Sequence, residues 1–433
     1  MKRLGIIAAM AVLFVSQGAY AQLDNLINSS AEWIRTPARN AATDAGDIVI
    51  YNPAGLVRLN NGFNINIGNQ SLFRKPSHTY DFGLGGGEQS FTQDGVDAFI
   101  PNLYASYKKD KWALFTGIFI SGGGATANYP NGSINTDLIA LQLLMQAQGA
   151  YGNVENQHLK ASSAYLTTTL GTSLAVSDRI SFAVAGRFIS ATNKTEAGMS
   201  LTQSPIGLPN TAFALNTSDK ASGYGVVLST MIKATPKFDM TLRYESAVKL
   251  DFETSTKQDD FGATTDGAKS RRDLPAVLAW GGAYSASSTV KVYADVNYYF
   301  QKQANWSNST TVTEEKKWSD LAGNAIAYNF GVTFNATPKF LWSVGGGYAD
   351  NQYADHNGYY TKLGAFEVAA EDNYNLNTGF SYKASPSVTL TCGYMHTFYN
   401  TQTIKALNAQ PLDVDVKVKN SLDAFAIGAN LQF

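Results

Sequence analysis

The stretch TLRYESAVKLDF places four ionisable side chains at positions of the same parity: Arg243, Glu245, Lys249 and Asp251. In an extended chain these four share one face. The opposite face is apolar and holds Leu242, Tyr244, Val248, Leu250 and Phe252. A strand with all its charges on one face and none on the other is typical of a barrel wall between lipid and a polar lumen, because a Lys or Arg facing mid-bilayer lipid costs about 2–4 kcal/mol.

A cation inside a lumen has two possible uses. Arg187, Arg243 and Lys249 all fall on predicted lumen faces. Each is able to receive the carboxylate of an amphiphilic ligand, or to form an internal salt bridge with a neighbour such as Glu245 or Asp251. The pattern alone leaves both alternatives open.

The sequence gives little support for a disulfide, a metal site or a nucleic-acid-binding surface. The single cysteine, Cys392, excludes an intramolecular disulfide and a multi-cysteine metal site. The four histidines show no metal-ligand spacing, and a formal net charge of -1 gives no electrostatic basis for binding nucleic acid. We therefore predict no metal, no cofactor and no nucleic-acid partner.

The elements that position these charges are predicted to be strands. Charged residues make up 15% of the chain, against roughly 25% in soluble domains. Alternating segments joined by short turns and long loops predict an all-β membrane protein, an antiparallel transmembrane β-barrel of about fourteen strands over residues 62–433. We expect the strands at 62–73, 101–108, 111–121, 161–176, 180–193, 221–233, 238–253, 274–285, 289–302, 326–336, 339–350, 373–384, 387–402 and 421–433. A large soluble β-protein is the alternative.

Both ends of the chain carry further signals. Residues 1–21 have a basic start, a short apolar core and the sequence Ala19-Tyr20-Ala21, which predict a secretory signal peptide. The last segment, DAFAIGANLQF, alternates and ends at Phe433. It resembles the terminal strand of bacterial outer-membrane barrels. That resemblance implies an outer-membrane location, contact with membrane lipid and recognition of this strand by the barrel-assembly machinery.

Residues 22–61 precede the first strand and do not alternate. They read as short helices broken at Pro37 and Gly46. A barrel of fourteen strands is wide, and wide barrels leave an aqueous channel unless something fills it. We therefore predict that residues 22–61 form a hatch, meaning a small plug inside the barrel. Asn52, Pro53, Ala54 and Gly55 favour a type I turn at the junction of hatch and wall.

The segment ARNAATDAGDIVIYNPAGLVRL resembles the N-terminal hatch of the FadL-type outer-membrane transporters, matching at Asn52, Pro53 and Ala54 and continuing through Gly55 and Leu56. PNLYASYKKDKWALFTGIFISGGG, RYESAVKLDF and DLPAVLAWGGAYSASSTVKVYADVNY extend the resemblance to the ninth strand. One departure is RTPARNAAT, where family hatches often carry Gly-Gly-Ala. The resemblance implies a transporter, not an enzyme. It would take up long-chain fatty acids or similar hydrophobic molecules by ligand-gated diffusion, with capture by extracellular loops and lateral exit near the third strand.

Two further sets of residues suit that function. The segment DLIALQLLMQAQGAYG has helical periodicity, which brings together Leu138, Leu141, Leu144 and Met145 as an apolar surface for ligand capture or as a packed cap. Gly117, Gly122 and Gly123 suit a bend in the third strand. A general porin, a surface adhesin and a barrel enzyme acting on lipids remain alternatives. The enzyme would need a serine paired with a histidine at the lipid-facing rim, where His396 is a candidate without a nucleophile motif.

Overall fold

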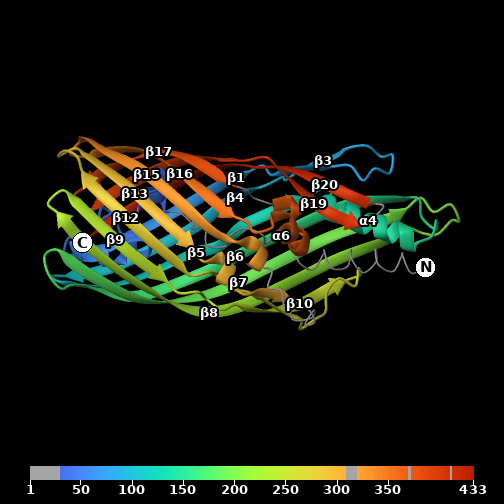
Figure 1. Ribbon diagram of the computed structural model, residues 1–433, viewed down its shortest axis with the longest axis horizontal. Helices are drawn as coiled ribbons and strands as arrows, with labels where there is room; N and C mark the ends of the chain where they lie inside the picture. The colour runs from blue at the N-terminus through green and yellow to red at the C-terminus, as the bar shows by residue number, and fades with distance from the viewer. Residues whose placement is uncertain (1–29, 309–318, 369–371, 410–411) are drawn as a thin grey trace.

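The computed structural model describes residues 30–308, 319–368, 372–409 and 412–433. The predicted signal peptide (1–21) and the first predicted hatch residues (22–29) lie outside this range. The molecule is elongated, with a strand wall along its length and a cluster of short elements at one end (Figure 1). Among the described residues, no helix is long and apolar enough to cross a bilayer.

The wall is a closed antiparallel barrel with fourteen strand positions, which confirms the predicted fold. Three positions are each built from two short strands in line. β21 pairs with β1 and closes the circle. The strands are β1 (Gly62–Arg74), β4 (Val96–Lys109), β5 (Trp112–Tyr129), β6 (Asn153–Ala175), β7 (Ile180–Thr202), β8 (Thr211–Thr235), β9 (Phe238–Glu245) with β10 (Asp251–Asp259), β11 (Lys269–Arg272) with β12 (Val277–Ser285), β13 (Val290–Tyr299) with β14 (Trp306–Asn308), β15 (Asn324–Thr337), β16 (Phe340–Gln352), β17 (Asn373–Ser385), β18 (Val388–Tyr399) and β21 (Ser421–Gln432).

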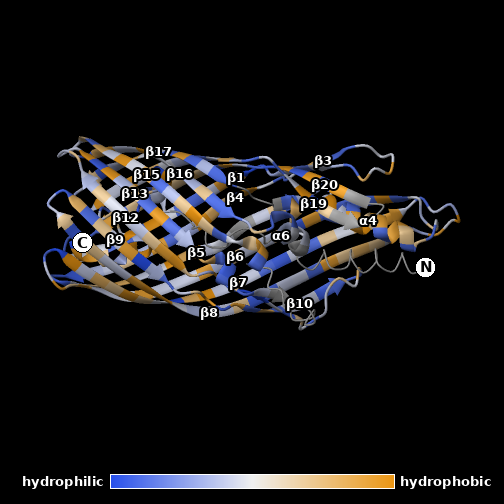
Figure 2. Cartoon of the chain, in the orientation of Figure 1, coloured by the Kyte–Doolittle hydropathy of each residue, from blue (hydrophilic) through white to orange (hydrophobic). Residues whose placement is uncertain are grey.

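The wall is apolar outside and polar inside. On β6, Leu170 is 69% exposed, whereas Thr167 and Ser173 are fully buried. The same inversion recurs on β21, where Ile427 is exposed and Ala426 is buried. Hydrophobic and hydrophilic residues succeed each other along the wall strands (Figure 2). An exposed apolar face around a closed wall is the pattern that lipid contact requires.

Several strands continue far beyond the lengths predicted from alternation. β6, β7 and β8 have 23, 23 and 25 residues, although about 9–11 residues of tilted strand cross a bilayer. The extra length lies at the end away from the short turns (Figure 1). We call the two ends of the barrel the short-turn end and the cap end.

The cap end is covered by a second sheet and several helices. The sheet has the order β19 (Gln402–Ala409), β20 (Leu412–Lys419), β2 (Ser77–Tyr80), β3 (Gln89–Thr92). The helices are α4 (Ile134–Gln146), α5 (Ser319–Ala322), α6 (His356–Leu363), η2 (Gln301–Gln303) and η4 (Phe366–Val368). Buried side chains from both groups form one apolar cluster that includes Ile134, Tyr360 and Val416. We call this assembly the cap.

The hatch lies inside the barrel and consists of α2 (Ala31–Arg35), α3 (Ile48–Tyr51) and η1 (Pro53–Arg58). Its residues are largely buried, including Ile34, Ala41 and Ile48. Inward-facing glycines of the wall let it approach closely. A Cβ on Gly345 would lie 2.7 Å from Pro37, and one on Gly393 would lie 2.6 Å from the Arg35 nitrogen. Part of the chain's high glycine content therefore serves hatch packing.

The strand predicted over residues 238–253 is interrupted. β9 ends at Glu245, and the chain turns inward before β10 begins at Asp251. Val248, Leu250 and Phe252 are buried, in a cluster with Ile189 of β7. The inward step is accommodated by Gly223 of β8, where a Cβ would lie 2.6 Å from Val248 Cγ1. The alternation therefore reverses across residues 246–250.

Because of this reversal, the predicted position of Lys249 on the lumen face is wrong. The Lys249 side chain is 60% exposed and pairs with Asp251 at 2.7 Å, while its apolar neighbours point inward. Lys249 therefore does not share the lumen face with Arg243, and these two residues belong to different environments.

Candidate functional site: a pocket between the hatch and the barrel wall

The residues Asn52, Pro53, Ala54 and Gly55 begin the 3-10 helix η1 and join the hatch to the wall. The Asn52 side chain donates to the Ala42 carbonyl at 2.9 Å, and so ties two parts of the hatch together. Ser173 of β6 and Ser181 of β7 donate to the carbonyls of Pro53 and Ala54 at 2.6 and 2.7 Å. The segment is thus bonded to the wall near the short-turn end. The Gly55 nitrogen donates to the Asn52 carbonyl at 2.8 Å, the backbone bond that a turn over these four residues requires.

A buried charge network holds the rest of the hatch. Arg39 bonds to Asp47 at 2.6 and 3.0 Å and pairs with Asp44 at 2.7 Å. Arg35 pairs with Asp44 at 3.3 Å. Glu32 accepts from Asn66 and Thr391 of the wall.

The hatch network holds three carboxyl groups and two guanidinium groups. Burial, helped by Asp47 and opposed by Arg39 and Arg35, raises the pKa of Glu32 to about 7. Burial and the one carboxyl group in excess of the guanidinium groups both favour the neutral form of Glu32.

Arg243 of β9 connects the wall to α3. Its side chain is 2% exposed. Nη1 donates to the carbonyls of Ile50 and Tyr51 at 2.7 and 2.5 Å, and Nε forms an ion pair with Glu245 at 3.1 Å. Arg243 does lie in the interior, as the alternation predicts. Nη1 is used by the two hatch carbonyls, whereas Nε is buried beside Glu245 without a hydrogen bond.

Arg187 of β7 lies on the other side of Glu245. Nη1 donates to Glu245 Oε2, and Nη2 donates to the Ser246 carbonyl at 2.6 Å, where the chain leaves the wall. Glu245 therefore bridges Arg187 and Arg243. Of the two uses that the sequence left open for Arg187 and Arg243, the structure shows an internal ion pair for each.

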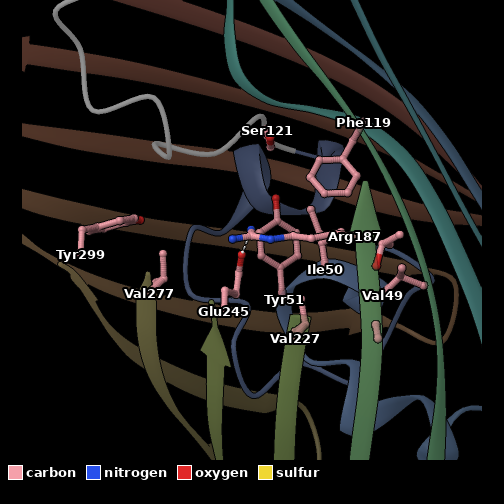
Figure 3. A pocket seen from close by; sticks show the side chains of 12 residues that line it. Val49, Ile50, Tyr51, Phe119, Ser121, Arg187, Val227, Glu245, Val277 and Tyr299 are labelled. Carbon is pink, nitrogen blue, oxygen red and sulfur yellow. Dashed lines mark hydrogen bonds and ion pairs between the residues drawn. The ribbon is translucent and has the colours of Figure 1, made fainter. Parts of the chain in front are cut away.

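A pocket that is partly open to solvent lies between α3 and the wall, beside this bridge. Eight of its twelve described lining residues are aliphatic or aromatic, as is usual for sites that bind apolar small molecules. Figure 3 shows Arg187 and Glu245 bonded together beside Tyr51. The lining residues are Val49, Ile50, Tyr51, Phe119, Ser121, Thr169, Ala185, Arg187, Val227, Glu245, Val277 and Tyr299.

Most of this lining was missed by the sequence analysis. Arg187 and Glu245 were singled out by charge. The sequence around Phe119, Val277 and Tyr299 does not distinguish these pocket residues from other residues of the wall. Their inward orientation is recoverable from alternation, but their meeting with α3 is not.

The wall beside the pocket loses its pairing between β4 and β5. The two strands pair from Lys109 and Trp112 up to Leu103 and Ile118, and no ladder pair follows in the described residues of this seam. β5 then has irregularities between Ile120 and Gly122 and between Gly123 and Ala125. Gly123 has φ 63°, which favours glycine. Near the cap end the seam is rejoined, because the Asp97 side chain accepts from the Thr126 nitrogen at 3.3 Å.

The predicted bend glycines have different surroundings. Gly122 and Gly123 lie at the irregularities of β5, whereas Gly117 lies in regular pairing with Tyr104 and Thr169. A Cβ on Gly117 would lie 3.2 Å from Val49 of α3. Gly117 therefore gives the hatch room to approach the wall.

Helix α4 is divided between two environments. Leu138 is buried in the cap cluster, while Leu141, Leu144 and Met145 are only partly buried. Its N-terminus is fixed by Ser133, which caps the helix and donates to Glu367 at 2.6 Å. The first turns are therefore part of the cap, and the last turns retain apolar surface.

His396 lies on β18 with its partner on the neighbouring strand. Its Nδ1 is 2.7 Å from Asp423 Oδ1, and Tyr394 donates to the same carboxylate at 2.6 Å. In the described part of the chain, no serine, threonine or cysteine hydroxyl or thiol bonds to His396. The pairing that a barrel lipase would need is not formed by these residues.

A scan against family models and a sequence search of curated proteins find no match. Comparison of folds does find similar solved structures. A FadL homologue of Pseudomonas aeruginosa has a TM-score of 0.69 and 13% identity, covering 94% of this chain and 98% of that one. The toluene transporter TodX of Pseudomonas putida has a TM-score of 0.62 and 13% identity, covering 95% and 100%. The toluene transporter TbuX of Ralstonia pickettii has a TM-score of 0.59 and 14% identity, covering 94% and 99%. These likenesses establish the shared fold.

Proposed function

We propose that the protein takes up hydrophobic small molecules across the bacterial outer membrane. The observation that carries this proposal is the mainly apolar pocket between α3 of the hatch and the wall. An apolar ligand gains about 0.8 kcal/mol for each methylene moved out of water. The similar solved structures include a FadL homologue and toluene transporters, which supports this class of ligand.

The orientation follows from the two ends of the barrel. Outer-membrane barrels have short periplasmic turns and longer extracellular loops. The short-turn end would therefore face the periplasm, and the cap would face the exterior. The hatch residues 22–61 would then close the periplasmic side of the bore.

Entry would begin at the cap. Leu141, Leu144 and Met145 offer partly exposed apolar surface there. Below them, β7 presents inward the apolar Leu201, Met199 and Ala197 and, after the polar Thr195 and Asn193, the apolar Ala191 and Ile189. Ala185 on the same strand lines the pocket. This sequence of side chains supports a route from the last turns of α4 to the pocket.

Exit would take place sideways through the seam between β4 and β5. Phe119 and Ser121 line the pocket and lie on β5 just beyond its last pair with β4. The seam lacks backbone pairing at this height, so parting it breaks few hydrogen bonds. Gly122 and Gly123 lie at the irregularities that permit the separation.

Gating would involve the hatch, because Val49, Ile50 and Tyr51 are pocket residues and hatch residues at once. A ligand that contacts these three residues would change the free energy with which α3 is held against Arg243. A general porin is less consistent with this arrangement, since the bore of a porin is open and the hatch occupies this one.

The experiment measures uptake of a labelled long-chain alcohol by cells that carry the protein, normalised to its surface abundance. Ser121→Trp narrows the pocket beside the seam and should reduce uptake severely. Ile118→Trp, on the same strand but on the outward face, is the matched control and should leave uptake near wild type. Equal uptake by both variants would contradict the proposed pocket and exit.

A further inference from the structure

The charge of the pocket indicates which hydrophobic molecules it accepts. Of its twelve described lining residues, only Arg187 and Glu245 have side chains with ordinary charges at neutral pH. They carry opposite charges and are bonded to each other. The pocket therefore has an apolar lining and one internally neutralised ion pair.

Arg187 has little capacity left for a ligand anion. Nη1 donates to Glu245 and Nη2 donates to the Ser246 carbonyl. Nε makes no hydrogen bond but is closed to solvent, because it lies against Gly225 of β8, where an added Cβ would be 2.8 Å away. The Arg187 side chain is 5% exposed and is held along the wall by these contacts.

The neighbouring cation, Arg243, is also engaged by other groups of the protein. Arg243 does not line the pocket, and its Nη1 is used by the carbonyls of Ile50 and Tyr51. A carboxylate entering the pocket would therefore have to displace Glu245 from Arg187. It would also lose its hydration in a mainly apolar site.

We propose that the Arg187–Glu245 pair makes the pocket selective for neutral hydrophobic ligands over carboxylates, with Glu245 as the residue that determines this specificity. The inference rests on the proposed function. A neutral ligand gains the full transfer free energy of its apolar surface. A carboxylate of the same length meets the charge of Glu245 and finds no free cation to offset it.

The test compares two ligands of equal chain length, labelled dodecanol and dodecanoate, at pH 8, where the acid is ionised. Affinities are measured on the purified full chain in lipid nanodiscs and corrected for partition into empty discs. We expect the wild type to prefer dodecanol by roughly tenfold or more, the order of discrimination that a modest charge repulsion produces.

Glu245→Gln keeps the shape of the side chain and releases Arg187. It should raise dodecanoate affinity by roughly tenfold while leaving dodecanol affinity within about twofold. Asp251→Asn is the matched control, because it removes a carboxylate paired with the exposed Lys249; it should change neither affinity. If Glu245→Gln fails to fold, Arg187→Met with Glu245→Met tests the other half of the argument, that a carboxylate is excluded unless a cation is free; it should retain dodecanol binding and rejection of dodecanoate.

Three results would overturn the inference. They are tighter or equal binding of dodecanoate by the wild type, an unchanged dodecanoate affinity in folded Glu245→Gln, and gain of dodecanoate binding in the double variant. Failure of the folded wild type to bind either ligand would refute the proposed function itself, and the inference with it.

Discussion

Replacing Arg243 by methionine should release the hatch without opening the wall. Arg243 Nη1 donates to the Ile50 and Tyr51 carbonyls at 2.7 and 2.5 Å. A hydrogen bond to a charged group contributes about 1.5–3 kcal/mol, so the two bonds stabilise the docked hatch by about 3–6 kcal/mol. Since 1.4 kcal/mol is a factor of ten, the undocked fraction should rise by about 10²-fold or more. Glu245 stays paired with Arg187, so no buried carboxylate is left alone.

Two measurements follow this release. Hydrogen exchange should accelerate at the Asn52 amide, which donates to the Ile48 carbonyl of α3 at 2.8 Å. Planar-bilayer recordings should show more frequent ion-conducting events. Heat-modifiable migration on gels should persist, because the wall pairing is untouched.

The control for this prediction is Arg271→Met, which removes a partly exposed wall arginine that pairs with Asp273 at 2.9 Å. It should alter neither Asn52 exchange nor conductance. Unchanged Asn52 exchange in folded Arg243→Met would show that Arg243 does not hold the hatch and would refute the reasoning.

Two further predictions concern the cap. Leu141→Asp with Leu144→Asp should lower uptake of a labelled hydrophobic compound at limiting concentration, because two charges in an apolar surface oppose ligand transfer; unchanged uptake per folded molecule would identify α4 as a cap only. Burial lowers the pKa of His78 to about 3, and its Nε2 accepts from the Ile134 nitrogen at 3.0 Å. The folded cap therefore keeps His78 neutral, and this stability is present above pH 6.5 and is lost as the pH falls from about 6.5 toward 3, because the unfolded cap takes up the proton. Protection of α4 amides, corrected for intrinsic exchange, should fall by up to about tenfold per pH unit between pH 6 and 4, and His78→Gln should remove this slope; a slope unchanged by that substitution would assign it to another group.

The barrel was predictable because its signal is local. Each wall strand alternates between lipid and lumen, so residues two apart record the same environment. Leu170 and Ser173 illustrate this, since the first is exposed to the outside and the second is buried inside. The described part of the hatch, residues 30–61, was also predictable as a separate segment, because it lacks the alternation that marks the wall strands.

The cap sheet had no such signal. β2 pairs with β20, which places His78 opposite Val418 from the far end of the chain. Strands of four to eight residues assembled from different loops depend on which loops meet above the barrel. The sequence of one loop does not contain that information.

The reversal at residues 246–250 shows how a local pattern fails. Alternation correctly places Arg243 and Glu245 inside, and then assigns Lys249 to the same face. The step inward by Val248 depends on Gly223 of the adjacent strand, so a feature of one strand reverses the face of another. A prediction from alternation assumes an uninterrupted strand, so it does not detect the point at which the chain leaves the wall and the inward and outward positions exchange.

The sequence by itself determined a closed β-wall, an internal N-terminal segment and the presence of charge inside the bore, because these follow from periodicity and composition along one strand at a time. The tertiary structure alone decided what that charge does. Arg187, Arg243 and Glu245 come from two strands and meet α3 of the hatch. Whether an interior arginine is free for a ligand depends on the distance to its nearest carboxylate, and that distance is set by the packing of separate segments.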